Sequence, residues 1–431
     1  MPNLILIVTD DQRADTLRYM PNVERLLVGH GVTFSRYYVT TSLCCPSRAS
    51  LLTGQYSRHT GVFDNVGPHG GAVAFDDRST LATWLAGDGY ATALVGKYLN
   101  GYPSFGQCYF PPGWTRWDAL DSEPEAHYFD YTLNRGGTLV HYGDAVRDYS
   151  TTVLVRLATR FATSARRPFF LYLAPSSPHR PATRLPRDER LFAHLPPFRP
   201  PSFDERDVSD KPWRARVPPL SRTRIDEIDH VREHQLESLQ ALDRSIGSMV
   251  RALRRAGKLD HTVIAFTSDN GFLWGEHRLL SKVWPYEESI RVPLVVRVPW
   301  VHRPRIDDHL ALNVDLAPTF ADLAGVHPGL PQDGRSLVPL LRSRSVPWRH
   351  AFVEEWLGRA DTDVGAPPPF EAVHTDRYLW VQYANGWREL YDLRTDPFEL
   401  RNLAADPRAR DLRLRLQGEL RRLLGAPPGE A

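Results

Sequence analysis

Short apolar runs alternate with amphipathic segments along most of this chain. The runs are rich in Leu, Ile, Val and Phe, and most successive positions within each run are apolar. Runs of this kind are typical of parallel strands that are buried on both faces of a sheet. They occupy residues 3–9, 91–95, 169–173, 263–267 and 292–298. Because helical patterns separate the runs, the sequence predicts a three-layer α/β sandwich with a large, mostly parallel sheet.

The helical segments have recognisable beginnings and ends. Apolar residues recur with helical spacing around Val23, and Pro46 is expected to open a short helix that would end near Gly54. A longer amphipathic helix is predicted for residues 228–256, because leucines and other apolar residues repeat along one face.

The pattern changes after about residue 345. Residues 378–383 and 387–393 flank the pair Asn385-Gly386, which is typical of a β-hairpin, and a last helix is predicted for residues 409–424. We therefore expect two domains: an α/β domain over residues 1–345 and a small α+β subdomain over residues 346–431.

The segment from Arg180 to Arg224 is rich in Pro and Arg and has little periodicity. Long irregular segments are usually functional loops or poorly ordered. One interpretation is that this segment borders a binding site and that its arginines hold anionic groups. The alternative is a surface insertion.

Composition excludes some classes of protein. The chain has 431 residues, is 42% hydrophobic and carries a formal net charge of +2. This near-neutral balance argues against a general nucleic-acid binder. The apolar run at residues 4–8 is far too short to span a membrane, and no basic residues precede it as they would in a signal peptide. We expect no membrane partner and a cytoplasmic location, or a secreted protein if a leader was removed.

Two polar segments follow predicted strands. Asp10 and Asp11 end the first run, and Ser268-Asp269-Asn270-Gly271 follows the run at residues 263–267. Ligands bind beyond the carboxyl ends of strands in open α/β sheets. Carboxylate and amide oxygens suit calcium or magnesium and disfavour zinc. Each segment alone has another interpretation, since it would also suit a solvated turn, a helix cap or an Asx turn.

Residues 44–48 read Cys-Cys-Pro-Ser-Arg at the start of a predicted helix. A thiol at a helix N-terminus is nucleophilic when the helix dipole lowers its pKa. The alternative for Cys44 is a buried structural cysteine. The three cysteines, which include Cys45 and Cys108, do not form a disulfide framework.

Lysine is rare in this chain. Of 53 basic residues only Lys97, Lys211, Lys258 and Lys282 are lysines. A retained lysine suggests a need for a compact ammonium group that a planar guanidinium cannot replace. The alternative for any one lysine is chance. Lys97, His179 and Lys282 form a group of candidate cations, although each alone would also suit a surface charge.

Taken in order, these motifs resemble the type I sulfatases of the alkaline phosphatase superfamily. The matching motifs are Asp-Asp, Cys-x-Pro-Ser-Arg, Gly-Lys, Pro-His, Asp-Asn-Gly and Lys. Family-like segments also occur at residues 314–319 and 389–393, so the resemblance covers nearly the whole chain. The double cysteine, the run at residues 96–100 and Pro-Pro-Gly-Trp at 111–114 resemble the N-acetylglucosamine-6-sulfatase branch in particular.

The resemblance implies hydrolysis of a sulfate ester of a sugar, a related alcohol or an aryl group. A formylglycine-generating enzyme would oxidise Cys44 to formylglycine, whose hydrate attacks sulfur and later expels inorganic sulfate. Arg48 would position this hydrate, and the cationic candidates Lys97, His179 and Lys282 would bind the sulfate. One calcium ion, or magnesium in its place, would be held by the hydrate at position 44 together with Asp10, Asp11, Asp269 and Asn270.

One position departs from the family pattern. Many arylsulfatases carry a histidine two residues after the motif lysine, where this chain has Leu99 followed by Asn100. The base that eliminates sulfate is therefore open, with His59, His277 or a metal-bound oxyanion as candidates. Two other functions also stay open: a phosphodiester or phosphonate monoester hydrolase with the same fold, and a carbohydrate-binding protein in which Cys44 is never converted.

Overall fold

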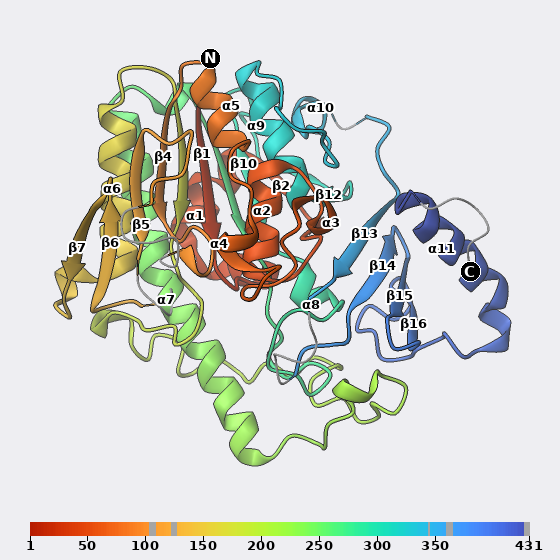
Figure 1. Ribbon diagram of the computed structural model, residues 1–431. Helices are drawn as coiled ribbons and strands as arrows, with labels where there is room; N and C mark the ends of the chain where they lie inside the picture. Colours follow the sequence, from red (N-terminus) through yellow and green to blue (C-terminus); the bar gives the residue numbers. More distant parts are fainter. Residues whose placement is uncertain (103–108, 122–126, 344, 359–364, 426–431) are drawn as a thin grey trace.

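A mixed ten-stranded sheet forms the centre of the molecule within the residues that the computed structural model describes, which are 1–102, 109–121, 127–343, 345–358 and 365–425 (Figure 1). In spatial order its strands are β11 (Arg305–Asp307), β2 (Gly31–Phe34), β10 (Leu294–Arg297), β9 (Thr262–Ser268), β1 (Asn3–Thr9), β8 (Phe169–Ala174), β4 (Ala91–Gly96), β5 (Arg116–Leu120), β6 (Tyr131–Arg135) and β7 (Thr138–Tyr142). The neighbouring strands from β9 to β5 are parallel, as predicted.

Strand β10 differs from the prediction. Its apolar run was grouped with the parallel strands, but it pairs antiparallel with both β9 and β2. A strand buried on both faces has the same apolar composition in either direction. Its direction is set by the connection that leads into it, which composition does not report.

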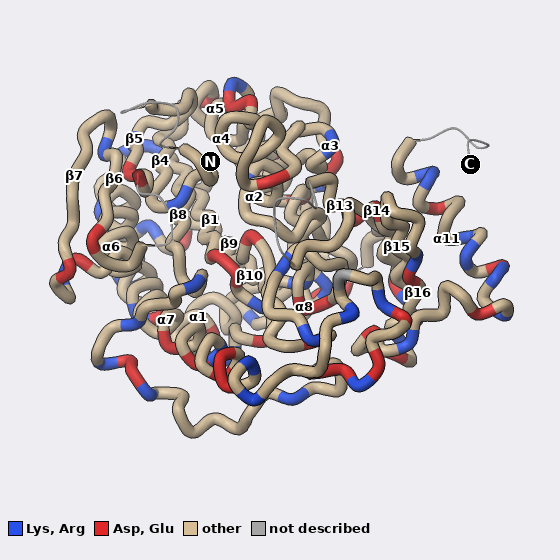
Figure 2. Tube along the Cα trace, turned by 60° about the horizontal axis from the view of Figure 1, so that its bottom comes forward, with Lys and Arg blue, Asp and Glu red and all other residues tan. Residues whose placement is uncertain are grey.

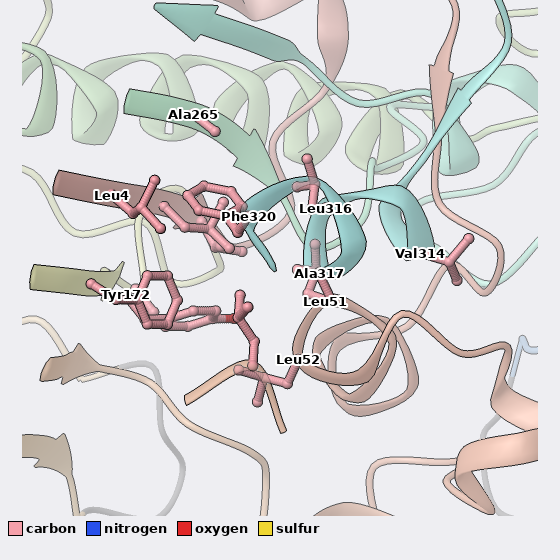
Figure 3. Close-up of a cluster of buried hydrophobic side chains, with 14 of the residues drawn as sticks. Leu4, Leu51, Leu52, Tyr172, Ala265, Val314, Leu316, Ala317 and Phe320 are labelled. Carbon is pink, nitrogen blue, oxygen red and sulfur yellow. The ribbon is translucent and has the colours of Figure 1, made fainter. Parts of the chain in front are cut away.

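Helices cover both faces of the sheet (Figure 1). One layer contains α1 (Pro21–Leu26), α6 (Ser150–Ser164) and α7 (Arg222–Arg255), and the other contains α2 (Cys44–Thr53), α5 (Leu81–Gly87) and α9 (Leu316–Ala324). Strand β1 serves both layers because successive side chains point to opposite faces. Leu4 (Figure 3) and Leu6 pack with the α2 and α9 side, whereas Ile5 and Ile7 pack with the α6 and α7 side.

Two helices begin earlier than predicted. Helix α7 starts at Arg222 and not near residue 228, and the Ser221 hydroxyl caps it by accepting the Arg224 N–H at 3.2 Å. The residues of α7 before Ile228 include a single apolar side chain, Ile225, which is too few to reveal a helical period. Helix α2 starts at Cys44, two residues before Pro46, and ends before Gly54 (φ 74°) in the left-handed conformation typical of a helix C-terminus.

A second, antiparallel sheet follows in the chain. It consists of β13 (Ala351–Trp356), β14 (Phe370–Thr375), β15 (Tyr378–Tyr383) and β16 (Arg388–Asp392), and α11 (Arg410–Leu423) packs on it. The predicted hairpin and last helix are thus confirmed, as is the fold class. The boundary near residue 345 stays a prediction.

Candidate active site

The two acidic segments meet at one edge of the sheet. Strands β1 and β9 are parallel, with Thr9 opposite Ser268, so the residues that follow them emerge side by side. The Asp11 N–H donates to Asp269 Oδ1 at 3.3 Å, which ties the two segments together. Asp11 adopts a φ of 66°, which turns the chain directly after the strand.

Cys44 is the first residue of α2, and its thiol points at this edge. The side chain is buried, with Sγ 2.9 Å from Lys282 Nζ and 3.6 Å from Asp10 Oδ1. Burial, and then the negative charge of Asp10, raise the pKa of Cys44 to about 12, against the weaker opposing effects of Lys282 and Lys97. The helix N-terminus therefore does not produce a reactive thiolate here, and the unmodified cysteine is a neutral thiol.

Lys97 lies directly after β4 and is buried beside Asp10, with Nζ 2.7 Å from Asp10 Oδ2. Gly96 permits this approach, because it adopts a φ of 115° and a Cβ there would lie 2.0 Å from the Ala174 carbonyl oxygen. Arg48 is fully buried behind Lys97. Its Nε donates to Asp269 Oδ2 at 2.8 Å and its Nη1 donates to the Lys97 carbonyl at 3.1 Å.

A second cationic group surrounds Asp11. Lys282 Nζ lies 2.5 Å from Asp11 Oδ1, and the Asn270 amide donates to the same oxygen at 2.6 Å. His179 Nε2 lies 3.7 Å from Asp11 Oδ2, while His179 Nδ1 is 2.6 Å from the Arg180 carbonyl. The nine residues singled out from the sequence thus come together in one site.

The cations decide the charge state of the carboxylates. Burial alone would raise the pKa of Asp10, but Lys97, followed by His179 and Arg48, lowers it well below its usual range. Burial and the neighbouring Asp10 raise the pKa of Asp269. Asp10 is therefore ionised at neutral pH, and its negative charge pairs with Lys97 and Arg48.

The residues present fit a hard divalent cation. Asp10, Asp11, Cys44 and His179 each offer a ligand atom, and these atoms lie within 4.8 Å of one another. In addition, Asn270 Oδ1 is buried and has no hydrogen-bond partner in the described structure, as a ligand oxygen would be without its ion. Asp269 is placed differently from the other candidates, because both of its oxygens accept hydrogen bonds from Arg48 and Asp11.

The candidate bases lie elsewhere. His277 is fully buried and its Nδ1 is 2.7 Å from Glu205 Oε2, while His59 is half-exposed and its Nδ1 is 2.7 Å from Asp333 Oδ2. Neither histidine belongs to the cluster of ligand atoms around Cys44 within the described residues.

Asn100, which follows Leu99 where the chain differs from the family pattern, is hydrogen-bonded to Cys45. The Asn100 N–H donates to the Cys45 sulfur at 2.9 Å, and the Cys45 thiol lies 3.3 Å from Asn100 Oδ1. Cys108, whose role was left open, falls outside the described residues.

In the arginine-rich segment after His179, two arginines form ion pairs with carboxylates of α7. Arg184 pairs with Glu237 at 3.1 Å and Arg199 pairs with Asp229 at 2.6 Å. These two arginines already have carboxylate partners, which leaves the other arginines of the segment to hold anions. That the segment holds substrate anions stays a prediction.

The structure adds two asparagines that sequence reasoning missed. Asn65 Oδ1 accepts the Cys45 N–H at 2.9 Å and so holds the first turn of α2. Asn313 connects the Ser47 hydroxyl to the Thr40 backbone, with distances of 3.1 Å to each. No sequence signal pointed to them, because they lie 20 and 266 positions from the residues that they hold.

Comparison with protein families supports this arrangement. The sulfatase family model matches residues 2–326, and the model for the C-terminal region of N-sulphoglucosamine sulphohydrolase matches residues 275–425. The chain is 33% identical to the N-acetylglucosamine-6-sulfatase of Homo sapiens, over 94% of this chain and 81% of that protein. It is 35% identical to the extracellular sulfatase SULF-1 homolog of Drosophila melanogaster, over 84% of this chain but only 33% of that longer protein.

Two solved structures share the fold. One is a protein in complex with its substrate D-glucosamine-2-N,6-O-disulfate, with a TM-score of 0.84, 24% identity, and coverage of 98% of this chain and 97% of that one. The other is the phosphonate monoester hydrolase of Agrobacterium radiobacter, with a TM-score of 0.82, 24% identity, and coverage of 99% and 96%.

The expected cytoplasmic location is wrong. It conflicts with the relatives, which include a protein named as an extracellular sulfatase that matches 84% of this chain. Within the described residues, no helix is both long enough and apolar enough to cross a bilayer.

The motif order, the convergence of its residues around Cys44 and the match over residues 2–326 agree, and the chain belongs to the sulfatase family of sulfuric ester hydrolases.

Proposed function

We propose that this chain hydrolyses a sulfate ester on a sulfated amino sugar, with formylglycine at position 44 as the nucleophile precursor. The observation that carries the proposal is the position of Cys44 Sγ, which lies 2.9 Å from Lys282 Nζ and 3.6 Å from Asp10 Oδ1. A thiol with a pKa of about 12 is a poor nucleophile at neutral pH, so its place at the centre of a cationic site favours conversion to the aldehyde hydrate.

We further propose that one calcium ion is held by Asp10, Asp11 and Asn270, with Asp269 as the fourth ligand when its hydrogen bond with Asp11 is given up. The unpartnered Asn270 Oδ1 and the all-oxygen character of this set support calcium, or magnesium in its place. When bound, such an ion polarises a sulfuryl oxygen and stabilises its developing charge.

The cationic side chains have separate tasks in this proposal. Lys97, Lys282 and His179 bind the sulfuryl oxygens and stabilise the charge that develops as the sulfur–oxygen bond breaks. Arg48 acts behind them and positions the nucleophile. Its Nε donates a hydrogen bond to Asp269 and its Nη1 donates one to the Lys97 carbonyl, and these bonds fix the spacing between the ends of β9 and β4.

The substrate class rests on the relatives. The similarity to an N-acetylglucosamine-6-sulfatase over nearly the whole chain supports a sulfated glucosamine unit. A formylglycine-generating enzyme would be the maturation partner. The shared fold with a phosphonate monoester hydrolase makes that activity the second candidate, because the fold does not separate the two.

Mass spectrometry of the tryptic peptide at residues 37–48 tests the proposal first. Conversion of Cys44 lowers the peptide mass by roughly 18 Da, from replacement of the CH2–SH group by an aldehyde. The converted protein is then assayed for release of sulfate from N-acetylglucosamine-6-sulfate and, in parallel, for cleavage of a phenyl phosphonate monoester. An unconverted Cys44, or faster turnover of the phosphonate ester, contradicts the proposal.

A further inference from the structure

A groove of about 790 Å³ lies between α6 and α7, on the helical layer opposite α2. Its lining is strongly cationic, and no aspartate or glutamate is among the residues that form it in the described structure. The arginines that line it are Arg156 and Arg160 from α6, Arg187 from the short 3-10 helix η5 (Pro186–Asp188), and Arg244, Arg251 and Arg255 from α7. Over the rest of the molecule, basic and acidic residues are interspersed (Figure 2).

Most of these arginines lack an acidic partner. Arg244 alone is neutralised, by two hydrogen bonds to Asp188 at 2.8 and 2.5 Å. The other five are exposed and form no ion pair with any described residue. Elsewhere in the chain, many arginines are paired in the manner of Arg199 with Asp229. The groove therefore concentrates unneutralised positive charge in a chain whose net charge is only +2.

The spacing of the arginines is also unfavourable for the helices themselves. Arg156 and Arg160 are four residues apart, as are Arg251 and Arg255, so each pair of like charges meets on one helix face. On α7, positions 244, 251 and 255 share one face and form a row of roughly 16 Å at 1.5 Å per residue. Repulsion of this kind is relieved when an anion with several charges lies along the row.

We propose that this groove binds sulfate groups of a sulfated glycan chain at positions outside the active site, which makes it an anchoring subsite for a polymeric substrate. The inference rests on the proposed function, because it takes the substrate to be a sulfated sugar. Guanidinium groups bind sulfate with two parallel N–H···O hydrogen bonds, a geometry that lysine does not offer. The chain also connects the two sites, since Arg187 follows His179 by eight residues.

Matched pairs of substitutions test the subsite. The variant Arg251→Gln/Arg255→Gln removes two groove charges, and glutamine keeps a helix propensity close to that of arginine. The control is Arg410→Gln/Arg415→Gln on α11, which removes two exposed charges outside the groove. For a heparan sulfate hexasaccharide we expect KM to rise roughly tenfold in the groove variant alone, with kcat unchanged. Kinetics on N-acetylglucosamine-6-sulfate should stay the same in both variants.

Binding without turnover separates this inference from the proposed function. Each double variant is combined with Cys44→Ala. Its affinity for a fluorescently labelled form of the same hexasaccharide is then measured at two salt concentrations, about 50 and about 200 mM NaCl. Weaker binding and a smaller salt dependence in the groove variant support the subsite even if no substrate is turned over. Equal binding by the groove variant and its control overturns it. Equally tight binding of a single-stranded DNA of matched charge also overturns it, because the groove would then be a general polyanion surface.

Discussion

Replacement of Lys97 by arginine is the sharpest test of the site. The side chain is 3% exposed, and its Nζ lies 2.7 Å from Asp10 Oδ2 with the Arg48 guanidinium bound to its own carbonyl. Burial is the largest single effect and lowers the pKa of Lys97, but the nearby acidic groups, Asp10 first, together raise it above its usual value, so the ammonium stays charged. A longer, planar guanidinium in this position must displace either Asp10 or Arg48.

The expected magnitude follows from that displacement. A misplacement of about 1 Å in a catalytic geometry costs on the order of 100-fold in rate. This loss equals about 2.7 kcal/mol of transition-state stabilisation. Overpacking of the enclosed side chain should also destabilise the fold by about 1–3 kcal/mol.

The assay is kcat/KM for sulfate release by wild type and Lys97→Arg, together with urea unfolding of both proteins. Lys258→Arg is the matched control, because Lys258 Nζ donates to the carbonyls of Ala162 and Ala165 and lies outside the site. A Lys97→Arg enzyme within about threefold of wild type, or roughly 0.65 kcal/mol, would refute the assignment of Lys97 to the sulfate-binding group.

Three further predictions concern the nucleophile, the ion and the response to pH. Cys44→Ala should lose turnover completely but keep an unfolding temperature within a few degrees of wild type, and residual turnover above a mock reaction would exclude the nucleophile. Asn270→Ala should lower the calcium content from about one ion per chain towards zero in elemental analysis, and stoichiometric zinc in the wild type would contradict the oxygen-ligand site. Burial, and then Glu276, raise the pKa of Glu288 from 4.5 to about 8. The stabilisation from this protonated carboxyl is thus complete below pH 4.5 and is lost as the pH rises through 8, so Glu288→Gln should flatten the decline in unfolding free energy between about pH 5 and 8, and parallel curves would refute this.

The sequence alone determined the α/β architecture and which residues gather at one edge of the sheet. Apolar runs alternating with helical periodicity are a local property of the chain, and they predicted β1, β4, β8 and β9 correctly. The carboxyl ends of parallel strands share an edge, so Asp10 and Asp269 could be expected to meet although 259 positions separate them. Arg48 was predicted as a site residue from its place in the Cys-x-Pro-Ser-Arg motif.

Only the tertiary structure decided how these groups pair. The direction of β10 depends on its connection, and the start of α2 at Cys44 depends on a hydrogen bond that the Cys45 N–H donates to Asn65 Oδ1, 20 positions away. The same holds for charge: a helix N-terminus predicts a lowered pKa for the Cys44 thiol, yet burial and Asp10 raise it to about 12. His277, a candidate base by sequence, is buried against Glu205. Pairing and charge state depend on burial and on partners far away in the chain, and both are set only when the layers pack together.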